Sequence, residues 1–468
     1  MEKTKKKSFK MPTAFTVLIA LIFVIGIITW FIPDVKSAKV SDLLMAPVSG
    51  FKSALDVSLF VLVLGGFLGV VTKTGALDAA IDTVVKKLNG KELYMIPILM
   101  FLISLGGTTY GMAEETIAFY ALVTATMVAA GFDSLVAAST ILLGSTTGVL
   151  GSTVNPFVVS SSMAALADSG IQINQSVVII VGAISWITCY VLAAIFVMRY
   201  AKKVKANKEA TLLTEEEQKA VFEKYGGEES ESKEIVFTGK QKLVMVLFAV
   251  SFVIMIIGVI PWENFGITIF KNTDFLTGAP LGAWWFSDLS TWFFLIAIIT
   301  GLVYGLKEHE IVSSFISGAS DLMSVALIIA VARGISVVMS TTGLDMYILK
   351  AASQALQGTN SVLYTGFAYM VYLLLSFLIP SSSGLATVTM PIIGPLTQSL
   401  GLAPEVAVCI LSGSCALINA VTPTSGVLMG GISIARIEYS TWLKYIWKIF
   451  LLLLVVHILI LSAAMVIF

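Results

Sequence analysis

Charged side chains are scarce in this sequence, because Asp, Glu, Lys and Arg together occupy only 12% of its 468 positions. A soluble domain carries roughly 25%. The mean hydropathy of +0.94 points the same way. The sequence therefore predicts an all-α membrane protein that lies in a lipid bilayer and crosses it several times. The formal net charge of 0 argues against a nucleic-acid partner.

Histidine and cysteine are also rare. The two histidines, His309 and His457, have no partner at metal-ligand spacing, and neither HExxH nor GxSxG occurs. Cys189, Cys409 and Cys415 all lie in apolar runs, so we expect small buried residues without a disulfide or a metal site. No Gly-rich phosphate loop is present. These absences argue against an enzyme with catalytic residues, against a resident cofactor and against ATP-driven transport.

Apolar runs dominate what the sequence does contain. They lie at about 13–33, 53–72, 93–106, 116–130, 135–160, 176–198, 243–261, 289–306, 317–341, 363–379, 385–400, 405–428 and 445–467. The run 93–106 has roughly 14 residues, or about 21 Å of helix, whereas the hydrocarbon core is about 30 Å thick. It ends in "GGTTYG", and the run 363–379 ends similarly in "PSSSG". We therefore expect two re-entrant hairpins, at 93–130 and 363–400, with tips inside the membrane.

Two further apolar runs contain polar interruptions. Residues 135–160 include "GSTTGVLGSTVNPF", and residues 405–428 include "SGSCALINAVTPTSG". Pro156 and Pro423 each remove a helix hydrogen bond and clash with the preceding turn. A simple proline kink would explain one such run. Two of them, each directly after a hairpin, predict two broken helices.

The order of these features repeats along the chain. "VVTKTGALD" at 70–78 resembles "VVMSTTGLD" at 337–345. An amphipathic stretch ending in Gly90 or Gly358 follows each, and then come a hairpin, a broken helix and a final span. The repeats run over about 50–199 and 315–468. They divide the chain into an N-terminal half (1–199), a linker (200–240) and a C-terminal half (241–468).

The distribution of positive charge sets an expected orientation. With nine spans, two hairpins and a cytoplasmic N-terminus, 23 of the 29 Lys and Arg residues face the cytoplasm, and 10 of these lie in 199–242, which includes the linker. Five face outside and Arg333 lies within a span, which agrees with the positive-inside rule. The two repeats are then inverted relative to each other, and the C-terminus ends outside. The linker is charged and lacks an extensive apolar face, so we expect a solvated connector, with a regulatory segment as the alternative.

Inverted repeats with helices broken at mid-membrane are typical of secondary transporters. Broken helix ends expose N–H and C=O groups, and nearby hydroxyls add further ligands for a substrate or an ion. Hairpin tips and helix breaks thus supply the candidate ligands. These are Thr108, Thr109, Gly111, Ser152, Thr153, Asn155, Ser381, Ser382, Ser383, Gly384, Asn419, Thr422 and Thr424.

The motifs "GMAEETIAFY", "GSTVNPF" and "INAVTPTSG" resemble the basic-amino-acid-antiporter branch of the anaerobic C4-dicarboxylate uptake C family, within the ion transporter superfamily. The resemblance covers nearly the whole chain. It implies an inverted-repeat elevator fold, usually a homodimer, with a scaffold domain and a moving transport domain. The breaks are also similar to the Ser-Asn-Thr cation motifs of sodium–dicarboxylate carriers, but the order here is Ser-Thr-Val-Asn-Pro. The expected coupling ion is therefore Na⁺ or H⁺.

Glu114 and Glu115 at the first hairpin tip indicate the substrate charge. Adjacent helical residues point about 100° apart, so one carboxylate can meet a substrate cation while the other holds a proton or hydrogen-bonds the tip. The alternative is that both are protonated or cap the helix N-terminus. The matching place in the second hairpin, "GLATVTM", has no acid. Arg333 is the nearest basic candidate, with a structural pairing and a substrate role both open.

These observations predict a secondary carrier for basic amino acids, of the arginine/ornithine type, in a bacterial plasma membrane. A carrier of C4-dicarboxylates or other carboxylates, coupled to Na⁺ or H⁺, is the first alternative. An intramembrane enzyme and a sensor or scaffold are the alternatives from other classes.

Overall fold

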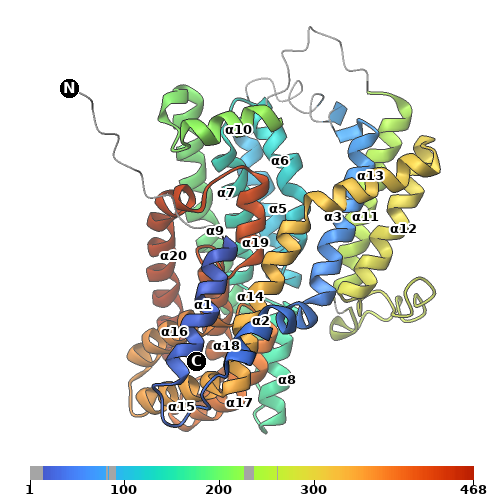
Figure 1. Ribbon diagram of the computed structural model, residues 1–468. Helices are drawn as coiled ribbons and strands as arrows, with labels where there is room; N and C mark the ends of the chain where they lie inside the picture. Colours follow the sequence, from blue (N-terminus) through green and yellow to red (C-terminus); the bar gives the residue numbers. More distant parts are fainter. Residues whose placement is uncertain (1–13, 78, 81–82, 84–90, 226–236, 261) are drawn as a thin grey trace.

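The computed structural model describes residues 14–77, 79, 80, 83, 91–225, 237–260 and 262–468. All regular elements in this part of the chain are helices (Figure 1). Eight of them are long and apolar enough to cross a membrane. The all-α fold with several membrane-spanning helices is therefore confirmed.

The helices of the N-terminal part are α1 (Ala14–Thr29), α2 (Val40–Ser53), α3 (Leu55–Lys73), η1 (Glu92–Tyr94), α5 (Met95–Tyr110), η2 (Glu114–Thr116), α6 (Ile117–Ala129), α7 (Ser134–Leu150), η3 (Pro156–Ser160), α8 (Ser161–Asp168) and α9 (Gln175–Ala206). The linker forms η4 (Lys208–Ala210) and α10 (Glu215–Tyr225). The C-terminal part contains α11 (Gly239–Val259), η5 (Trp262–Phe265), α12 (Phe286–Tyr304), α13 (Glu308–Asp321), α14 (Met323–Thr342), α15 (Leu344–Leu356), α16 (Ser361–Leu378), α17 (Ser382–Ser399), α18 (Pro404–Asn419), α19 (Gly426–Ile434) and α20 (Tyr439–Ile467).

One group of helices packs in a reciprocal pattern. Helices α1 and α2 pack along α14, while α12 and α13 pack along α3 (Figure 1). Glycines allow the backbones to approach closely in both places, because a Cβ atom on Gly50 would overlap Gly334 and one on Gly318 would overlap Gly65. Helices from both parts of the chain thus form one packed unit.

A second group of helices, α5, α6 and α7, forms the first hairpin and the helix that follows it. A Cβ atom on Gly144 of α7 would lie 3.1 Å from the Met100 carbonyl oxygen of α5, and one on Gly148 would overlap the Ser104 carbonyl oxygen. Residue numbers rise in step, so α5 and α7 run parallel. Only residues 130–133 connect α6 to the start of α7. Helix α6 must therefore run back from the end of α5.

Helices α16 and α17 also turn back on each other. Tyr364 hydrogen-bonds Thr397, and the Tyr372 hydroxyl donates to Thr389 Oγ1 at 3.0 Å. Residue numbers fall on one helix as they rise on the other, so the two helices are antiparallel. In Figure 1 they lie at the lower end of the molecule, whereas α6 and α10 lie at the upper end.

The first arm of each hairpin is longer than expected, so the expectation that these arms are too short to cross a membrane was wrong. The structure continues the helical path of the first arm over Glu92–Tyr110, 19 residues, and α16 has 18 residues. Both are long enough to cross a membrane. In the first hairpin the reason is that the Gly106–Thr109 segment remains helical instead of ending the arm. The evidence for a return is thus the direction of the following helix and not the shortness of the arm.

The expected span 317–341 was also placed wrongly. The segment up to Asp321 belongs to α13, and α14 begins at Met323 after a break in the helix at Leu322. Helices α2 and α13 were not predicted, because each carries charged residues and is only 14 residues long. The amphipathic stretch expected before Gly358 is α15. Its counterpart before Gly90 lies mostly outside the described residues.

The linker is not a purely solvated connector in its first part. Leu213 and Val221 are buried. The Glu217 carboxylate accepts hydrogen bonds from Glu438 N at 2.7 Å and Thr441 Oγ1 at 3.1 Å, at the start of α20. A few apolar residues among many charges were enough for docking, because buried hydrogen bonds supplement their small apolar area. The rest of the linker, 226–236, lies outside the described residues.

Candidate functional site

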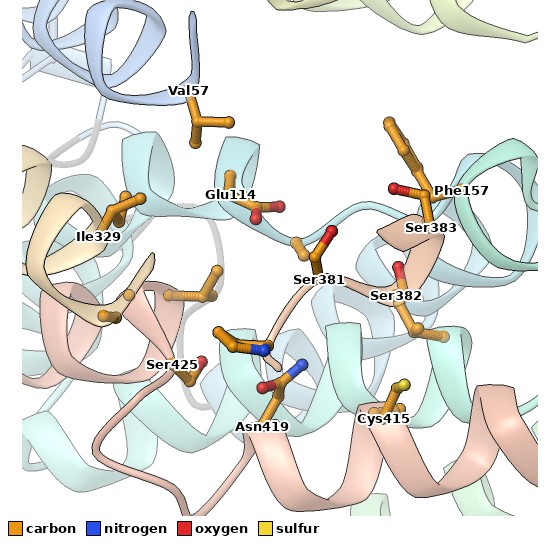
Figure 2. Close-up of a pocket in the computed structure, with 18 of the residues that line it drawn as sticks. Val57, Glu114, Phe157, Ile329, Ser381, Ser382, Ser383, Cys415, Asn419 and Ser425 are labelled. Carbon is orange, nitrogen blue, oxygen red and sulfur yellow. The ribbon is translucent and has the colours of Figure 1, made fainter. Parts of the chain in front are cut away.

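A cavity of about 330 Å³ lies where the two hairpin turns, both helix breaks and α14 meet. Figure 2 shows Glu114, Ser381 and Asn419 pointing toward the same space. Ligand pockets have volumes of about 300–1,000 Å³. The cavity is therefore large enough for a small molecule.

The first hairpin turn separates the roles of the two glutamates. Helix α5 ends at Tyr110, and the next residue, Gly111, has a φ of 84°, in the left-handed region that favours glycine. Glu114 lines the cavity (Figure 2). Glu115 is 2% exposed, does not line the cavity, and accepts a hydrogen bond from Ala113 N at 3.1 Å. Glu115 therefore stabilises the turn, while Glu114 faces the cavity.

Hydroxyl groups join this turn to the first helix break. Thr108 Oγ1 donates to the Gly151 carbonyl at 2.6 Å, and Thr153 N donates to the Thr108 carbonyl at 2.9 Å. Asn155 Oδ1 accepts from Phe157 N at 2.9 Å, and its Nδ2 donates to Ser152 Oγ at 3.0 Å. These bonds satisfy backbone groups that the break frees.

The second hairpin brings a helix N-terminus to the cavity. Ser381 precedes α17, and its Oγ accepts a hydrogen bond from Gly384 N at 3.3 Å. Ser381, Ser382 and Ser383 line the cavity (Figure 2). The positive end of the α17 dipole therefore faces the cavity and favours a negatively charged group there.

The second helix break supplies an amide and another helix N-terminus. Asn419 lines the cavity, and its Oδ1 atom is buried without a hydrogen-bond partner among the described residues. Thr424 Oγ1 donates to the Phe377 carbonyl at 2.9 Å, which ties the break to the second hairpin. Ser425 Oγ accepts from Leu428 N at 3.3 Å at the start of α19.

The structure gathers only part of the predicted ligand set around the cavity. The residues that line it are Gly111, Glu114, Asn155, Ser381, Ser382, Ser383, Asn419 and Thr424. The predicted residues outside the lining are Thr108, Thr109, Glu115, Ser152, Thr153, Gly384 and Thr422. Most of their polar groups instead bond neighbouring backbone or hydroxyl groups, as Thr109 Oγ1 does with the Leu105 carbonyl at 2.7 Å.

Several lining residues were not predicted. They include Asp56, Ser145, Thr146, Phe157, Trp285 and Ser425. Phe157 and Trp285 form an aromatic pair with ring centroids 4.8 Å apart, and Ser145 Oγ donates to the Met112 carbonyl. A carboxylate inside the apolar run 53–72 was a usable signal for Asp56. The aromatic residues carry no such signal, because apolar side chains fill every span.

Both signs of charge meet in this cavity. Arg333, at the middle of α14, lines it together with Glu114, and the two groups attract each other electrostatically. None of the ion pairs within 4.0 Å among described residues includes either side chain. Asp56 adds a second carboxylate. The site can thus offer one positive and two negative groups to a ligand.

No three His, Cys, Asp or Glu side chains in the described segments are arranged to hold a metal ion. The three cysteines are free and buried, as expected.

Comparison with protein families identifies the chain. The model of the C4-dicarboxylate anaerobic carrier family, DcuC, matches residues 45–466. The chain belongs to this family. It is therefore a multi-pass membrane transporter.

Two relatives of this DcuC-family chain cover most of its length. A protein of Haemophilus influenzae, described as uncharacterized, is 28% identical over 94% of this chain and 94% of its own. The "putative basic amino acid antiporter YfcC" of Escherichia coli is 27% identical over 85% of this chain and 74% of its own.

Two solved structures align with the DcuC-family chain. The YdaH transporter of Alcanivorax borkumensis has a TM-score of 0.47 and 15% identity, and the alignment covers 97% of this chain and 98% of that one. MtrF of Neisseria gonorrhoeae, described with a class of antimetabolite efflux pumps, has a TM-score of 0.43 and 17% identity over 97% and 95% of the two chains.

Proposed function

We propose that this chain is a secondary active transporter that exchanges basic amino acids of the arginine/ornithine type. The observation that carries the proposal is the separation of the two glutamates. Glu115 is tied to the hairpin turn, whereas Glu114 faces the cavity. A carboxylate accepts a guanidinium through two parallel hydrogen bonds and accepts an ammonium as a point charge.

The relative named as a putative basic amino acid antiporter supports the same substrate class. Asp56 supports it too, because a second carboxylate at the cavity makes the lining carboxylates outnumber Arg333. An uncompensated carboxylate in a membrane is costly. The cationic side chain of a substrate would compensate it and would explain why the charge is kept.

A carboxylate carrier coupled to Na⁺ or H⁺ is the second candidate. The family description names C4-dicarboxylates, and Arg333 with the N-terminus of α17 offers positive charge to an anion. Neither observation accounts for Glu114. The two functions predict opposite substrate preferences, so transport measurements separate them.

The test is exchange in proteoliposomes. Vesicles preloaded with ornithine should take up labelled arginine, and vesicles preloaded with succinate should not take up labelled succinate. Glu114→Gln keeps the shape of the side chain, removes its charge and should abolish arginine exchange. Glu115→Gln serves as a comparison, since it lies outside the cavity and should chiefly lower thermal stability. Succinate exchange without arginine exchange would establish the carboxylate carrier instead.

We also propose that the two repeats are inverted and that transport uses an elevator movement. The reciprocal packing of α2 with α14 and of α13 with α3 supports the repeat. In this mechanism the hairpins and helix breaks move together past α3 and α14, which supply the facing wall of the cavity. Disulfide cross-linking between cysteines introduced on α3 and on α6, which contact each other, should depend on substrate if the two units slide. Substrate-independent cross-linking at every depth would refute the movement.

The proposal also covers the location, the oligomeric state and the coupling ion of the carrier. The carrier would lie in a bacterial plasma membrane with a cytoplasmic N-terminus, as a homodimer, and a gradient of Na⁺ or H⁺ would couple to transport. Arginine uptake under each imposed gradient separately distinguishes the two ions from pure exchange.

A further inference from the structure

Arg333 is placed unusually for a structural arginine. It is the one charged residue in the 20-residue sequence of α14, at its middle, with Ile329 and Ala332 beside it on the cavity wall. A charged side chain deep in a membrane is costly and is usually paired or functional. Its role therefore depends on what its guanidinium meets.

A structural role would require a partner that is already in place. Among described residues, no carboxylate lies within 4.0 Å of Arg333, and its guanidinium donates no hydrogen bond. A guanidinium has five N–H donors in a planar fork. These donors are left for a ligand, because the cavity is the space that the side chain lines.

Glu114 attracts Arg333 but does not contact it. The space between them belongs to the same cavity of about 330 Å³. A molecule with a carboxylate at one end and a cation at the other can meet both groups at once. A diamine offers cations to Glu114 and Asp56 but nothing to Arg333, which repels a cation placed beside it.

The surroundings also favour a carboxylate at this wall. Ser382 begins α17 and Gly426 begins α19, and both residues line the cavity. Two helix N-termini thus add partial positive charge to that of Arg333. The cavity therefore has positive groups on α14, α17 and α19 and negative groups at Glu114 and Asp56.

We infer that Arg333 binds the carboxylate of the substrate and makes the site reject cations that lack one. The inference rests on the proposed function, since it assigns the opposite end of the same basic amino acid to Glu114. A carboxylate accepts two parallel hydrogen bonds from a guanidinium, which fixes the orientation of the substrate as well as its charge. Arg333 is thus a specificity-determining residue that distinguishes amino acids from the corresponding amines.

The test compares arginine with agmatine, which is arginine without its carboxylate. Each compound competes, unlabelled, with labelled arginine for exchange into ornithine-loaded proteoliposomes. In the parent, agmatine should compete at least about tenfold more weakly than arginine, because a site built for a polar group rejects the analogue that lacks it. In Arg333→Gln the two should compete within about twofold of each other, since the carboxylate no longer contributes.

Arg333→Lys keeps the charge but loses the fork, so its discrimination should lie between the two. If a variant no longer transports, competition of unlabelled arginine and agmatine with bound labelled arginine gives the same arginine-to-agmatine ratio. The exposed Arg199 on α9 provides the control, and Arg199→Gln should keep the parental ratio. Thermal stability of each variant in detergent shows whether it is folded. If Arg333→Gln does not fold, the ratio of arginine to agmatine competition in Arg333→Lys tests the assignment instead.

The outcomes separate the inference from the function on which it rests. If the parent neither binds nor exchanges arginine, the proposed function is wrong. If the parent exchanges arginine and Arg333→Gln retains the parental ratio of arginine to agmatine, the function stands and the assignment of Arg333 is wrong.

Discussion

Glu217 is expected to hold the linker on the membrane-embedded part of the protein. It is 4% exposed, and its carboxylate accepts hydrogen bonds from Thr214 N at 2.6 Å, Glu438 N at 2.7 Å and Thr441 Oγ1 at 3.1 Å. The first bond caps α10 itself. The other two join α10 to the start of α20, so Glu217→Ala should weaken docking more than it weakens the helix.

The expected magnitude follows from these two bonds. A hydrogen bond to a charged group contributes about 1.5–3 kcal/mol, so the pair contributes about 3–6 kcal/mol. Water reaches the freed donors once α10 moves away, which reduces the expected net loss to about 2–4 kcal/mol. Leu213 and Val221 remain buried and contribute about 1.5–3 kcal/mol each. In Glu217→Ala, α10 should therefore detach from the start of α20 more often, but it should still bind there most of the time.

Hydrogen–deuterium exchange of the α10 amides measures this opening. A loss of about 2–4 kcal/mol should raise the open population roughly 30- to 800-fold, and exchange of these amides should accelerate accordingly. Glu223→Ala is the matched control on the same helix. Glu223 is exposed, and its ion pair with Lys219 at 3.8 Å contributes little. Equal exchange in Glu217→Ala and Glu223→Ala would refute the assigned role of Glu217.

Three further predictions concern packing and orientation. Gly413→Ala should cost about 1–3 kcal/mol, because its Cβ would overlap the buried ring of His457. The control Gly366→Ala has no atom within 4 Å of its Cβ and should be neutral or stabilising by up to about 1 kcal/mol, so equal melting temperatures for the two variants would contradict the packing argument. Tyr372→Phe should cost about 1 kcal/mol in thermal unfolding, since it removes one hydrogen bond between the arms of the second hairpin and leaves its partner bonded elsewhere. Reporter fusions at residue 226 and after Phe468 should report opposite sides of the membrane, and the same side for both would rule out inverted repeats.

Some properties of the site could be read from local sequence. Glycines and hydroxyls inside apolar runs marked the hairpin turns and breaks, because backbone groups freed at such depth need nearby partners. Gly111, Asn155 and Asn419 lie in the turns and breaks found in this way, and they line the cavity. The same signal could not tell a ligand from a residue that joins two turns. Thr108 illustrates the limit, since its hydroxyl bonds the Gly151 carbonyl 43 positions away.

Pairs of neighbouring residues show the same limit. Glu114 and Glu115 have identical side chains, and helical geometry gave each an equal claim to the cavity. The fold distinguished them through one hydrogen bond, from Ala113 N to Glu115. That bond depends on the path of the turn after Gly111, which local propensity does not specify.

The sequence by itself determined the class of protein, the positions of most helices and the polar turns, because these depend on hydrophobic run length and on the chemistry of glycine, proline and hydroxyl groups. Only the tertiary structure decided which polar groups share a cavity. Arg333, Asp56 and Glu114 come from separate helices or turns, and their meeting depends on close helix packing at glycines such as Gly50 and Gly318. Such long-range approaches follow from the packing of whole helices against one another, which no local pattern of residues encodes.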